Sequence, residues 1–254
     1  MNYLPWLIAV LAVLGLVYLS RRSRLVSQTL LYGFLGLLAL VMVLPFFWMF
    51  VLSTHLTSDI FSNPPPFWFG GNLMANFQAM NEAVSVGRSF LNSLLVSSAH
   101  TALVLLFCSM GGYAFSVYDF PGKKTLFAIL LATMMIPGIA GIIPWFFLIT
   151  KLGWINNFLA LIIPGAANAF GIFWMRQYCQ NNVPTSLMEA AKIDGCPEWS
   201  IFFRVVAPIL LPAYSALGIM QFVGVWNDFM VPMLVLRDTN MRPLPIMLSY
   251  MRGD

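Results

Sequence analysis

Long apolar runs, nearly free of charge, alternate with polar segments along the whole chain. Each run is about as long as, or longer than, the roughly 17–25 residues that a helix needs to cross the hydrocarbon core of a bilayer. Six such runs are found, at residues 4–19, 30–52, 90–117, 126–149, 158–175 and 205–236. The pattern predicts an all-α fold, a polytopic membrane bundle of about six transmembrane helices.

The polar segments between the runs predict the side of the membrane on which each loop lies. Basic residues favour the cytoplasmic side, and they cluster at residues 21–24 and 123–124. With alternating orientation, the first run is then a retained span with its amino end outside, rather than a signal peptide. The proline- and aromatic-rich stretch at 59–71 becomes an external loop, and the long polar segment at 176–204 becomes an inner loop.

Composition excludes a soluble domain. The chain of 254 residues is 60% hydrophobic and 9% charged, whereas about 25% of the residues of a soluble domain are charged. The formal charge of +4 comes from scattered basic residues, which is typical of membrane loops rather than of a nucleic-acid-binding surface. Cys108, Cys179 and Cys196 stand far apart, so neither a disulfide framework nor a metal site is expected. His55 and His100 are isolated and are expected in contacts with solvent or helices.

The inner polar segment predicts two short helices joined at a glycine. Ser186 and Glu189 have the S-x-x-E spacing of a capping box, so the first helix is expected to begin at Ser186. Gly195 can take the left-handed conformation that ends a helix, and Pro197 suits the first turn of the second helix. Spacings of three and four place four residues on one face of the first helix: Leu187, Ala190, Ala191 and Asp194. An ordinary loop helix, with Glu189 only completing the cap, has the same local pattern.

The same segment resembles the EAA signature of permease subunits in binding-protein-dependent ABC importers. That signature reads E-A-A-x3-G-x9-I-x-L-P, and the chain matches it from Glu189 to Gly195 and again at Pro208, with two aliphatic positions changed. Asp194 before the glycine fits the sugar-importing branch. The resemblance is closest to the smaller permease subunit of maltose-type importers. Further similar stretches are Asn92-Ser93, Tyr113–Phe115, Phe120–Lys123, Gly171–Gln177 and Trp226–Phe229.

The resemblance implies a domain organisation and a set of partners. Residues 28–254 would form a transmembrane domain of the ABC-importer type without the usual final helix. Residues 1–27 would form an additional N-terminal transmembrane helix and a basic cytoplasmic turn. A short helix would couple the chain to a separate ATPase through Glu189, Ala190, Ala191, Asp194 and Gly195. The implied assembly is a multi-pass complex of the bacterial plasma (inner) membrane, with a second permease subunit, two ATPase subunits, an extracytoplasmic sugar-binding protein and surrounding lipid.

We expect no cofactor on this chain, and ATP with its magnesium ion would be bound by the partner ATPase. Residues 117–124 only loosely approach a phosphate-binding loop, because Val117 stands where glycine is needed and Lys124 stands where serine or threonine is needed. The sequence shows neither a nucleophile–base pair nor a cluster of metal ligands. The chain is therefore expected not to be an enzyme.

Trp226, Asn227 and Asp228 form the candidate substrate path. Trp226 and Asn227 could stack on and hydrogen-bond a sugar, and a carboxylate near a bilayer boundary is a functional candidate. Each residue also has an ordinary structural interpretation. Tryptophan anchors membrane interfaces, and Asp228 could cap a helix end.

Three functions are consistent with these patterns. The leading one is a permease subunit that forms half of the translocation path of a carbohydrate importer. The second is an ion-coupled secondary transporter, which would use intramembrane carboxylates, histidines or unwound helices. The third is a non-transporting membrane scaffold derived from a shortened chain. Dependence on a partner ATPase, on an ion gradient or on neither would separate the three.

Overall fold

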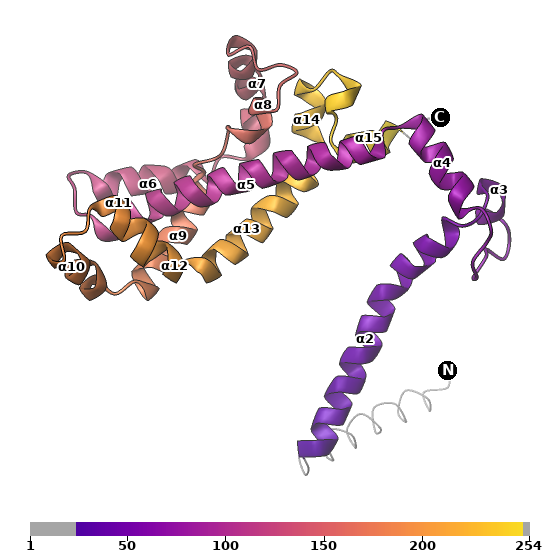
Figure 1. The fold of residues 1–254 in the computed structure, drawn as a ribbon, viewed down its shortest axis with the longest axis horizontal. Helices are drawn as coiled ribbons and strands as arrows, with labels where there is room; N and C mark the ends of the chain where they lie inside the picture. Colours follow the sequence, from indigo (N-terminus) through magenta and orange to yellow (C-terminus); the bar gives the residue numbers. More distant parts are fainter. Residues whose placement is uncertain (1–23, 251–254) are drawn as a thin grey trace, which may run out of the picture. The chain divides into compact units, whose positions relative to one another are not determined.

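The computed structural model describes residues 24–250, and this part of the chain contains helices, turns and loops but no strand (Figure 1). The all-α fold expected from the apolar runs is confirmed. The chain divides into two compact units, residues 1–82 and residues 83–254. The additional helix expected at residues 1–27 lies almost wholly outside the described residues.

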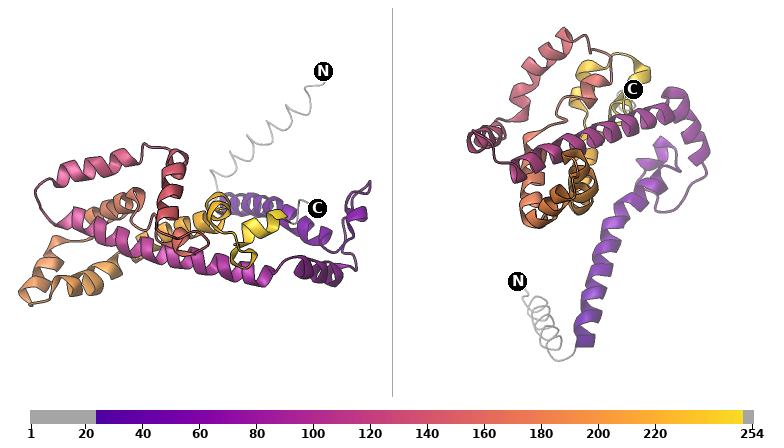
Figure 2. Two further views of the ribbon diagram at one scale, coloured as in Figure 1. Left: turned by 90° about the horizontal axis from the view of Figure 1, so that it is seen from above. Right: turned by 60° about the vertical axis from the view of Figure 1, so that its left-hand side comes forward.

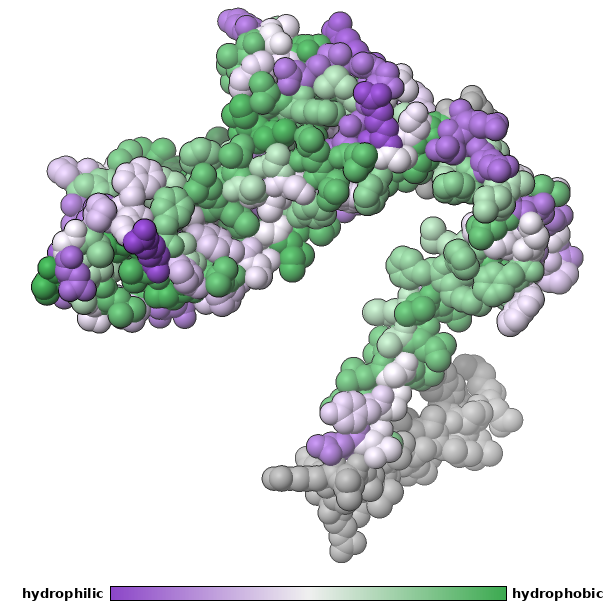
Figure 3. Space-filling model, in the orientation of Figure 1, coloured by the Kyte–Doolittle hydropathy of each residue, from purple (hydrophilic) through white to green (hydrophobic). Residues whose placement is uncertain are grey.

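The first unit has one long helix followed by a compact loop. Helix α2 runs over Arg24–Leu52, α3 over Thr57–Ile60 and α4 over Leu73–Ala83. The span expected at residues 30–52 is therefore part of α2. Large apolar side chains, among them Leu37 and Phe46, are exposed along this helix (Figure 3). Such a surface suits hydrocarbon rather than water as the surrounding solvent.

Two side chains hold the loop after α2 together. The Nδ2 of Asn76 donates to the carbonyl oxygens of Ser53 and His55, both at 2.8 Å. The Nε2 of His55 lies 2.7 Å from the carbonyl oxygen of Trp68. His55 thus binds loop backbone, which differs from the solvent or helix contact expected for it.

The second unit is organised around α5 (Val86–Val117), which contains the span expected at residues 90–117. Helices α9 (Ala169–Asn182) and α13 (Leu211–Trp226) pack along it (Figure 2). The other elements of this unit are α6 (Lys123–Thr133), η1 (Gly138–Gly141), α7 (Ile142–Lys151), α8 (Leu159–Ile162), α10 (Thr185–Ile193), α11 (Glu198–Ser200), the π-helix η2 (Ile201–Val206), α12 (Ala207–Ile209), α14 (Met230–Val235), η3 (Thr239–Met241) and α15 (Leu244–Tyr250).

Glycine allows α5 and α9 to approach closely. A Cβ atom at Gly112 would lie 2.6 Å from both the Cβ of Met175 and the backbone nitrogen of Arg176. At Gly171 it would lie 2.5 Å from the Sγ of Cys108. Small residues at such crossings are the usual means of packing helices in membranes, where van der Waals contact replaces the hydrophobic effect between helices. The core at this crossing consists of Val104, Cys108, Ile172, Met175, Ala213 and Leu217.

Three of the expected spans are not single straight helices. The run at 126–149 bends by 94° between α6 and η1–α7, and the run at 205–236 meets a 78° bend between α12 and α13. The run at 158–175 is interrupted between α8 and α9, where Pro164 precedes Gly165 with a φ of 81°. Proline lacks an amide donor and glycine accepts a positive φ, so both residues can end a helix. Neither lowers the hydropathy of the run enough for the break to be visible in the sequence.

The expected number of spans is correspondingly reduced in the part of the chain that the structure describes. Two helical segments between residues 24 and 250, Ser27–Leu52 and Val86–Val117, are long and apolar enough to cross a membrane. Up to four spans result if each bent pair counts as one. The run at residues 4–19 lies outside the described residues.

Candidate functional site

The inner segment folds into the expected pair of short helices joined at a glycine. Gly195 has a φ of 74°, as predicted. Its amide donates to the carbonyl oxygen of Lys192, and the amide of Cys196 donates to that of Ala191, both at 3.0 Å. These two bonds form the Schellman motif that ends a helix at a left-handed residue. Helix α10, this turn and α11 are called the inner corner below.

The start of α10 differs from the prediction. The helix begins at Thr185, with Pro184 as the N-cap residue, and no side chain makes a capping hydrogen bond. Ser186 therefore lies inside the first turn rather than before it, so the capping box expected from Ser186 and Glu189 is wrong. Pro184 explains the shift, because its fixed φ suits the entry to a helix one residue earlier than the serine spacing suggested.

The predicted coupling residues have different environments. Ala191 is buried and packs, with Met188, into a core that includes Tyr113 and Phe202. Four of the five predicted residues are exposed: Glu189, Ala190, Asp194 and Gly195. Ala191 consequently holds α10 on the bundle, while the other four are open to a partner. The shared face predicted for α10 is divided in the same way, since Leu187 and Asp194 are exposed and Ala191 is not.

An exposed apolar patch surrounds the inner corner. It consists of Leu187, Ile193, Trp199 and Phe203, and is called the corner patch below. Ile193 is 86% exposed, and the rings of Trp199 and Phe203 stack with centroids 6.0 Å apart. Ile193, Trp199 and Phe203 occupy variable positions of the coupling signature and Leu187 precedes it, so the signature did not reveal the patch. Large apolar side chains exposed within one region of a protein commonly mark a site of interaction.

Hydrogen bonds to Glu198 tie the inner corner to the end of α5. The hydroxyl of Tyr118 donates to Glu198 Oε2 at 2.5 Å, and Lys192 Nζ lies 3.0 Å from Glu198 Oε1. Burial, and then the bond to Glu198, raises the pKa of the Tyr118 hydroxyl, which therefore remains a donor. The same carboxylate raises the pKa of Lys192 through their hydrogen bond. The two helices of the corner are thus linked to each other and to α5 through one side chain.

Replacing Glu198 by alanine should loosen the inner corner. The change removes the acceptor of both Tyr118 and Lys192. Because the ion pair is half exposed, we expect a modest effect, amide exchange across residues 185–200 faster by roughly two- to fivefold. Hydrogen–deuterium exchange of the detergent-solubilised chain measures it. Asp119→Ala is the matched control, since it removes the exposed partner of Lys123 on a neighbouring turn; equal exchange in the two variants would contradict the role of Glu198.

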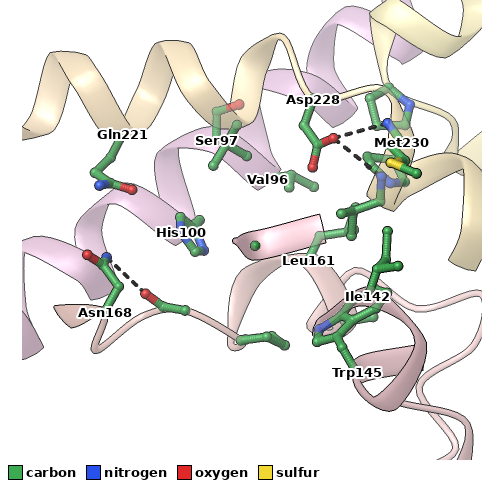
Figure 4. Close-up of a pocket in the computed structure, with 18 of the residues that line it drawn as sticks. Val96, Ser97, His100, Ile142, Trp145, Leu161, Asn168, Gln221, Asp228 and Met230 are labelled. Carbon is green, nitrogen blue, oxygen red and sulfur yellow. Dashed lines mark hydrogen bonds between the residues drawn. The ribbon is translucent and has the colours of Figure 1, made fainter. Parts of the chain in front are cut away.

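A cavity of about 660 Å³ lies within the second unit, between α5, α7, α8 and α13 (Figure 4). Sites for small ligands commonly have volumes of roughly 300–1,000 Å³. The polar and aromatic residues of its wall come from separate segments of the chain, namely Ser93, Ser97, His100, Trp145, Asn168, Gln221 and Asp228. The cavity therefore exists only once these helices are packed together.

Backbone groups hold some of the polar side chains in the wall. The Nδ1 of His100 donates to the carbonyl oxygen of Ile162 at 2.9 Å, which is a helix contact of the expected kind. The Oδ1 of Asn168 accepts from the amide of Gly171 at 2.7 Å. The hydroxyl of Ser97 is buried and has no hydrogen-bond partner within residues 24–250. This hydroxyl is the one polar side-chain group of the described wall that is both buried and without an internal partner.

Asp228 is the one predicted path residue in the cavity wall. Its Oδ1 accepts from the amides of Met230 at 3.1 Å and Val231 at 3.3 Å, so it also caps the start of α14. The cap at a helix end, one of the two interpretations made from the sequence, is confirmed, and the same carboxylate lines the cavity.

Trp226 and Asn227 are not among the wall residues. The ring of Trp226 stacks on Phe222 with centroids 5.6 Å apart and meets Phe90 edge-on at 5.4 Å. The Nδ2 of Asn227 donates to the carbonyl oxygen of Val223 at 2.9 Å. These two side chains are engaged within or beside α13, away from the cavity.

Sequence reasoning missed Ser97 and Gln221, although both leave a signal. Ser89, Ser93, Ser97 and Thr101 recur every four residues and are all buried, which places a polar stripe on one face of α5. Gln221 is a carboxamide inside the apolar run at 205–236. Polar side chains inside membrane spans commonly mark a pathway.

In residues 24–250, no group of three or more His, Cys, Asp and Glu side chains could hold a metal ion.

Comparison with known proteins decides the family. The family described as "Binding-protein-dependent transport system inner membrane component" matches residues 110–252, more than half of the chain. The chain belongs to this family of permeases. The matched residues contain the inner corner, α7, α8 and α13, so the permease signature and most of the cavity wall both fall within the family match.

Individual relatives agree with the family match. The lactose transport system permease protein LacG of Rhizobium radiobacter is 34% identical over 86% of this chain and 79% of its own length. The arabinooligosaccharides transport system permease protein AraQ of Halalkalibacterium halodurans is 35% identical over 90% of this chain and 82% of its own. A solved bacterial ABC transporter involved in the import of the acidic polysaccharide alginate has a chain that matches this permease with a TM-score of 0.75 and 26% identity, covering 88% and 79% of the two chains.

These matches confirm the resemblance first seen in the EAA signature. The permease is an inner-membrane component of a transport system, and these two relatives are named as permease proteins of sugar transport systems. The fold expected from that resemblance is confirmed as well, because the structure superposes on a permease chain of an ABC importer over most of its length.

Proposed function

We propose that this permease is a subunit of an ATP-driven carbohydrate importer, where it forms half of the translocation path and couples to a separate ATPase. The observation that carries the proposal is the family match, which spans the inner corner and reaches the cavity wall. The relatives are named for lactose and for arabinooligosaccharides, and the solved transporter imports alginate. All three substrates are saccharides, which supports carbohydrate as the class of cargo.

The proposed assembly contains a second permease subunit, two ATPase subunits and an extracytoplasmic sugar-binding protein in the bacterial plasma membrane. ATP and magnesium would be bound by the ATPase subunits, and this chain would hold no cofactor. The corner patch supports a docked protein at the inner corner, because exposed side chains such as Ile193 and Trp199 lose unfavourable contact with water when a partner covers them. Glu189, Ala190, Asp194 and Gly195 would transmit the motion of that partner.

The ion-coupled alternative rests on Asp228 as an intramembrane carboxylate. Its Oδ1 accepts two backbone amides of α14. These two bonds hold the side chain at the start of α14, where it caps the helix. The position of Asp228 therefore supports a structural role with a share in the cavity wall rather than ion coupling.

Sugar uptake by the reconstituted complex tests the proposal. We expect proteoliposomes that hold this permease with its partner permease, ATPases and binding protein to accumulate a radiolabelled oligosaccharide when ATP is enclosed. Uptake should cease without ATP and should be insensitive to a proton ionophore. Uptake that persists without ATP and collapses with the ionophore would support the secondary transporter instead, and the absence of uptake under both conditions would favour the scaffold.

A further inference from the structure

The cavity wall carries almost no charge. Of the 21 residues that line it, Asp228 alone has an acidic side chain, and none is lysine or arginine. The imidazole of His100 is engaged with backbone, because its Nδ1 donates to the carbonyl oxygen of Ile162. The wall therefore holds one carboxylate and neither an ammonium nor a guanidinium group.

The uncharged polar groups suit a ligand rich in hydroxyl groups. Ser97 has a buried hydroxyl without a partner in the described part of the chain, and Gln221 offers both an amide donor and a carbonyl acceptor. Each hydroxyl of a sugar can donate one hydrogen bond and accept others. A neutral sugar can therefore satisfy these groups without bringing a charge into the bundle.

The opposite side of the cavity is aromatic and apolar. Figure 4 shows Trp145 and Ile142 facing the side from which Ser97, Gln221 and Asp228 project. An indole ring presents a flat apolar surface with a polar edge. A sugar ring has the matching character, since its C–H bonds form an apolar face and its hydroxyls lie around the rim. The two walls thus complement the two aspects of one sugar ring.

Binding of an acidic sugar in this cavity is unfavourable. A uronic acid unit carries a carboxylate, and burying a charge without a cationic partner is strongly unfavourable. The carboxylate of Asp228 adds repulsion between like charges. Sites that take anionic groups usually supply arginine or lysine, and neither is present among the described residues that line the cavity.

We propose that this cavity is a binding site for neutral glycosyl units, and that Asp228 together with the lack of a cationic wall residue discriminates against uronic acid units. This inference rests on the proposed function of a carbohydrate importer and adds the class of sugar. Discrimination inside the membrane would then act as a second filter after the binding protein. Because relatives of this chain serve neutral as well as acidic saccharides, membership of the family alone does not decide between the two classes.

Direct sugar binding to the purified complex, without its binding protein, tests this inference. Equilibrium dialysis at pH 8 would compare lactose and arabinotriose, as neutral probes, with trigalacturonate. For the unaltered complex, we expect at least one neutral probe to bind about tenfold or more tightly than trigalacturonate. Equal or tighter binding of trigalacturonate would overturn the inference.

Two substitutions assign the effect to this cavity rather than to the partner permease. Gln221→Lys adds a cation to the wall and should tighten trigalacturonate binding by about tenfold. Asp228→Asn keeps an oxygen that can cap α14 while removing the charge, and should change trigalacturonate binding in the same direction. Gln180→Lys is the matched control, because Gln180 is exposed and is not among the wall residues, and trigalacturonate binding should stay as in the unaltered complex.

The outcomes separate this inference from the proposed function. If the complex accumulates a sugar with ATP but Gln221→Lys and Gln180→Lys bind trigalacturonate equally, the cavity is not the discriminating site and the inference alone fails. If neither class of sugar binds and no ATP-driven uptake occurs, the importer proposal fails with it. Correct folding of each variant is checked by its co-purification with the partner permease.

Discussion

Replacing Gly195 by proline should abolish the capture of an ATPase subunit by this permease. The native φ of 74° is inaccessible to proline, whose φ stays near −65°. The substitution also removes the amide that donates to the carbonyl oxygen of Lys192. Both effects redirect the chain after α10 and disperse the exposed residues of the inner corner. In a pull-down from detergent, we expect the amount of co-purified ATPase to fall about tenfold or more.

Gly195→Asn is the control for this experiment. Asparagine tolerates the left-handed conformation better than most residues, and no atom lies within 4 Å of a Cβ at this position. Capture should therefore be largely retained. Undiminished capture by the proline variant would show that the ATPase docks elsewhere on the chain. Loss of capture in both variants would show that the glycine itself, rather than its backbone conformation, is required.

Replacing Gly112 by valine should severely destabilise the second unit. Even the first added carbon would lie 2.6 Å from the backbone nitrogen of Arg176 and from the Cβ of Met175. Backbone cannot move aside as a flexible side chain can, so α5 and α9 must separate. Overpacking of this kind costs about 3 kcal/mol or more. We expect the unfolding midpoint of the detergent-solubilised chain to fall by roughly 5–10 °C, measured by circular dichroism.

Gly224→Ala provides the comparison for Gly112. No atom lies within 4 Å of a Cβ at Gly224 on α13, so the added methyl group meets open space. Alanine also favours a helix over glycine by up to about 1 kcal/mol. The midpoint should stay unchanged or rise slightly. A similar fall in both variants would mean that glycine flexibility, rather than the close approach of α5 and α9, accounts for the loss.

Local rules were sufficient to predict most of α5 and the turn at Gly195. Helix α5 follows from an apolar run without proline or an internal charge after Arg88, and the turn at Gly195 follows from glycine before a proline. The breaks in the other runs were harder to place. Hydropathy measures the transfer of side chains into lipid, and the Pro164-Gly165 pair leaves the hydropathy of the run nearly unchanged. The same pair removes a helical amide donor and permits a positive φ, and these two changes end the helix.

The site depended on contacts between distant parts of the chain. Tyr118 and Glu198 are 80 residues apart, and only the packing of α11 against the end of α5 brings them together. The cavity joins Ser97, Trp145 and Gln221 from three helices. Each residue alone looks like an ordinary feature of a membrane helix. The sequence signature drew attention to the inner corner, because the corner is one continuous segment, whereas the cavity has no continuous segment to recognise.

The cysteines of this permease provide a chemical handle at the inner corner. Cys108 and Cys179 are buried, whereas Cys196, directly after Gly195, is exposed. A maleimide dye requires an accessible thiolate, so it should label Cys196 first. The attached dye would lie beside the Schellman turn, where a docking subunit would change its emission and shield it from a quencher. Assembly and dissociation could then be followed in time on the natural sequence, without introducing any residue for labelling.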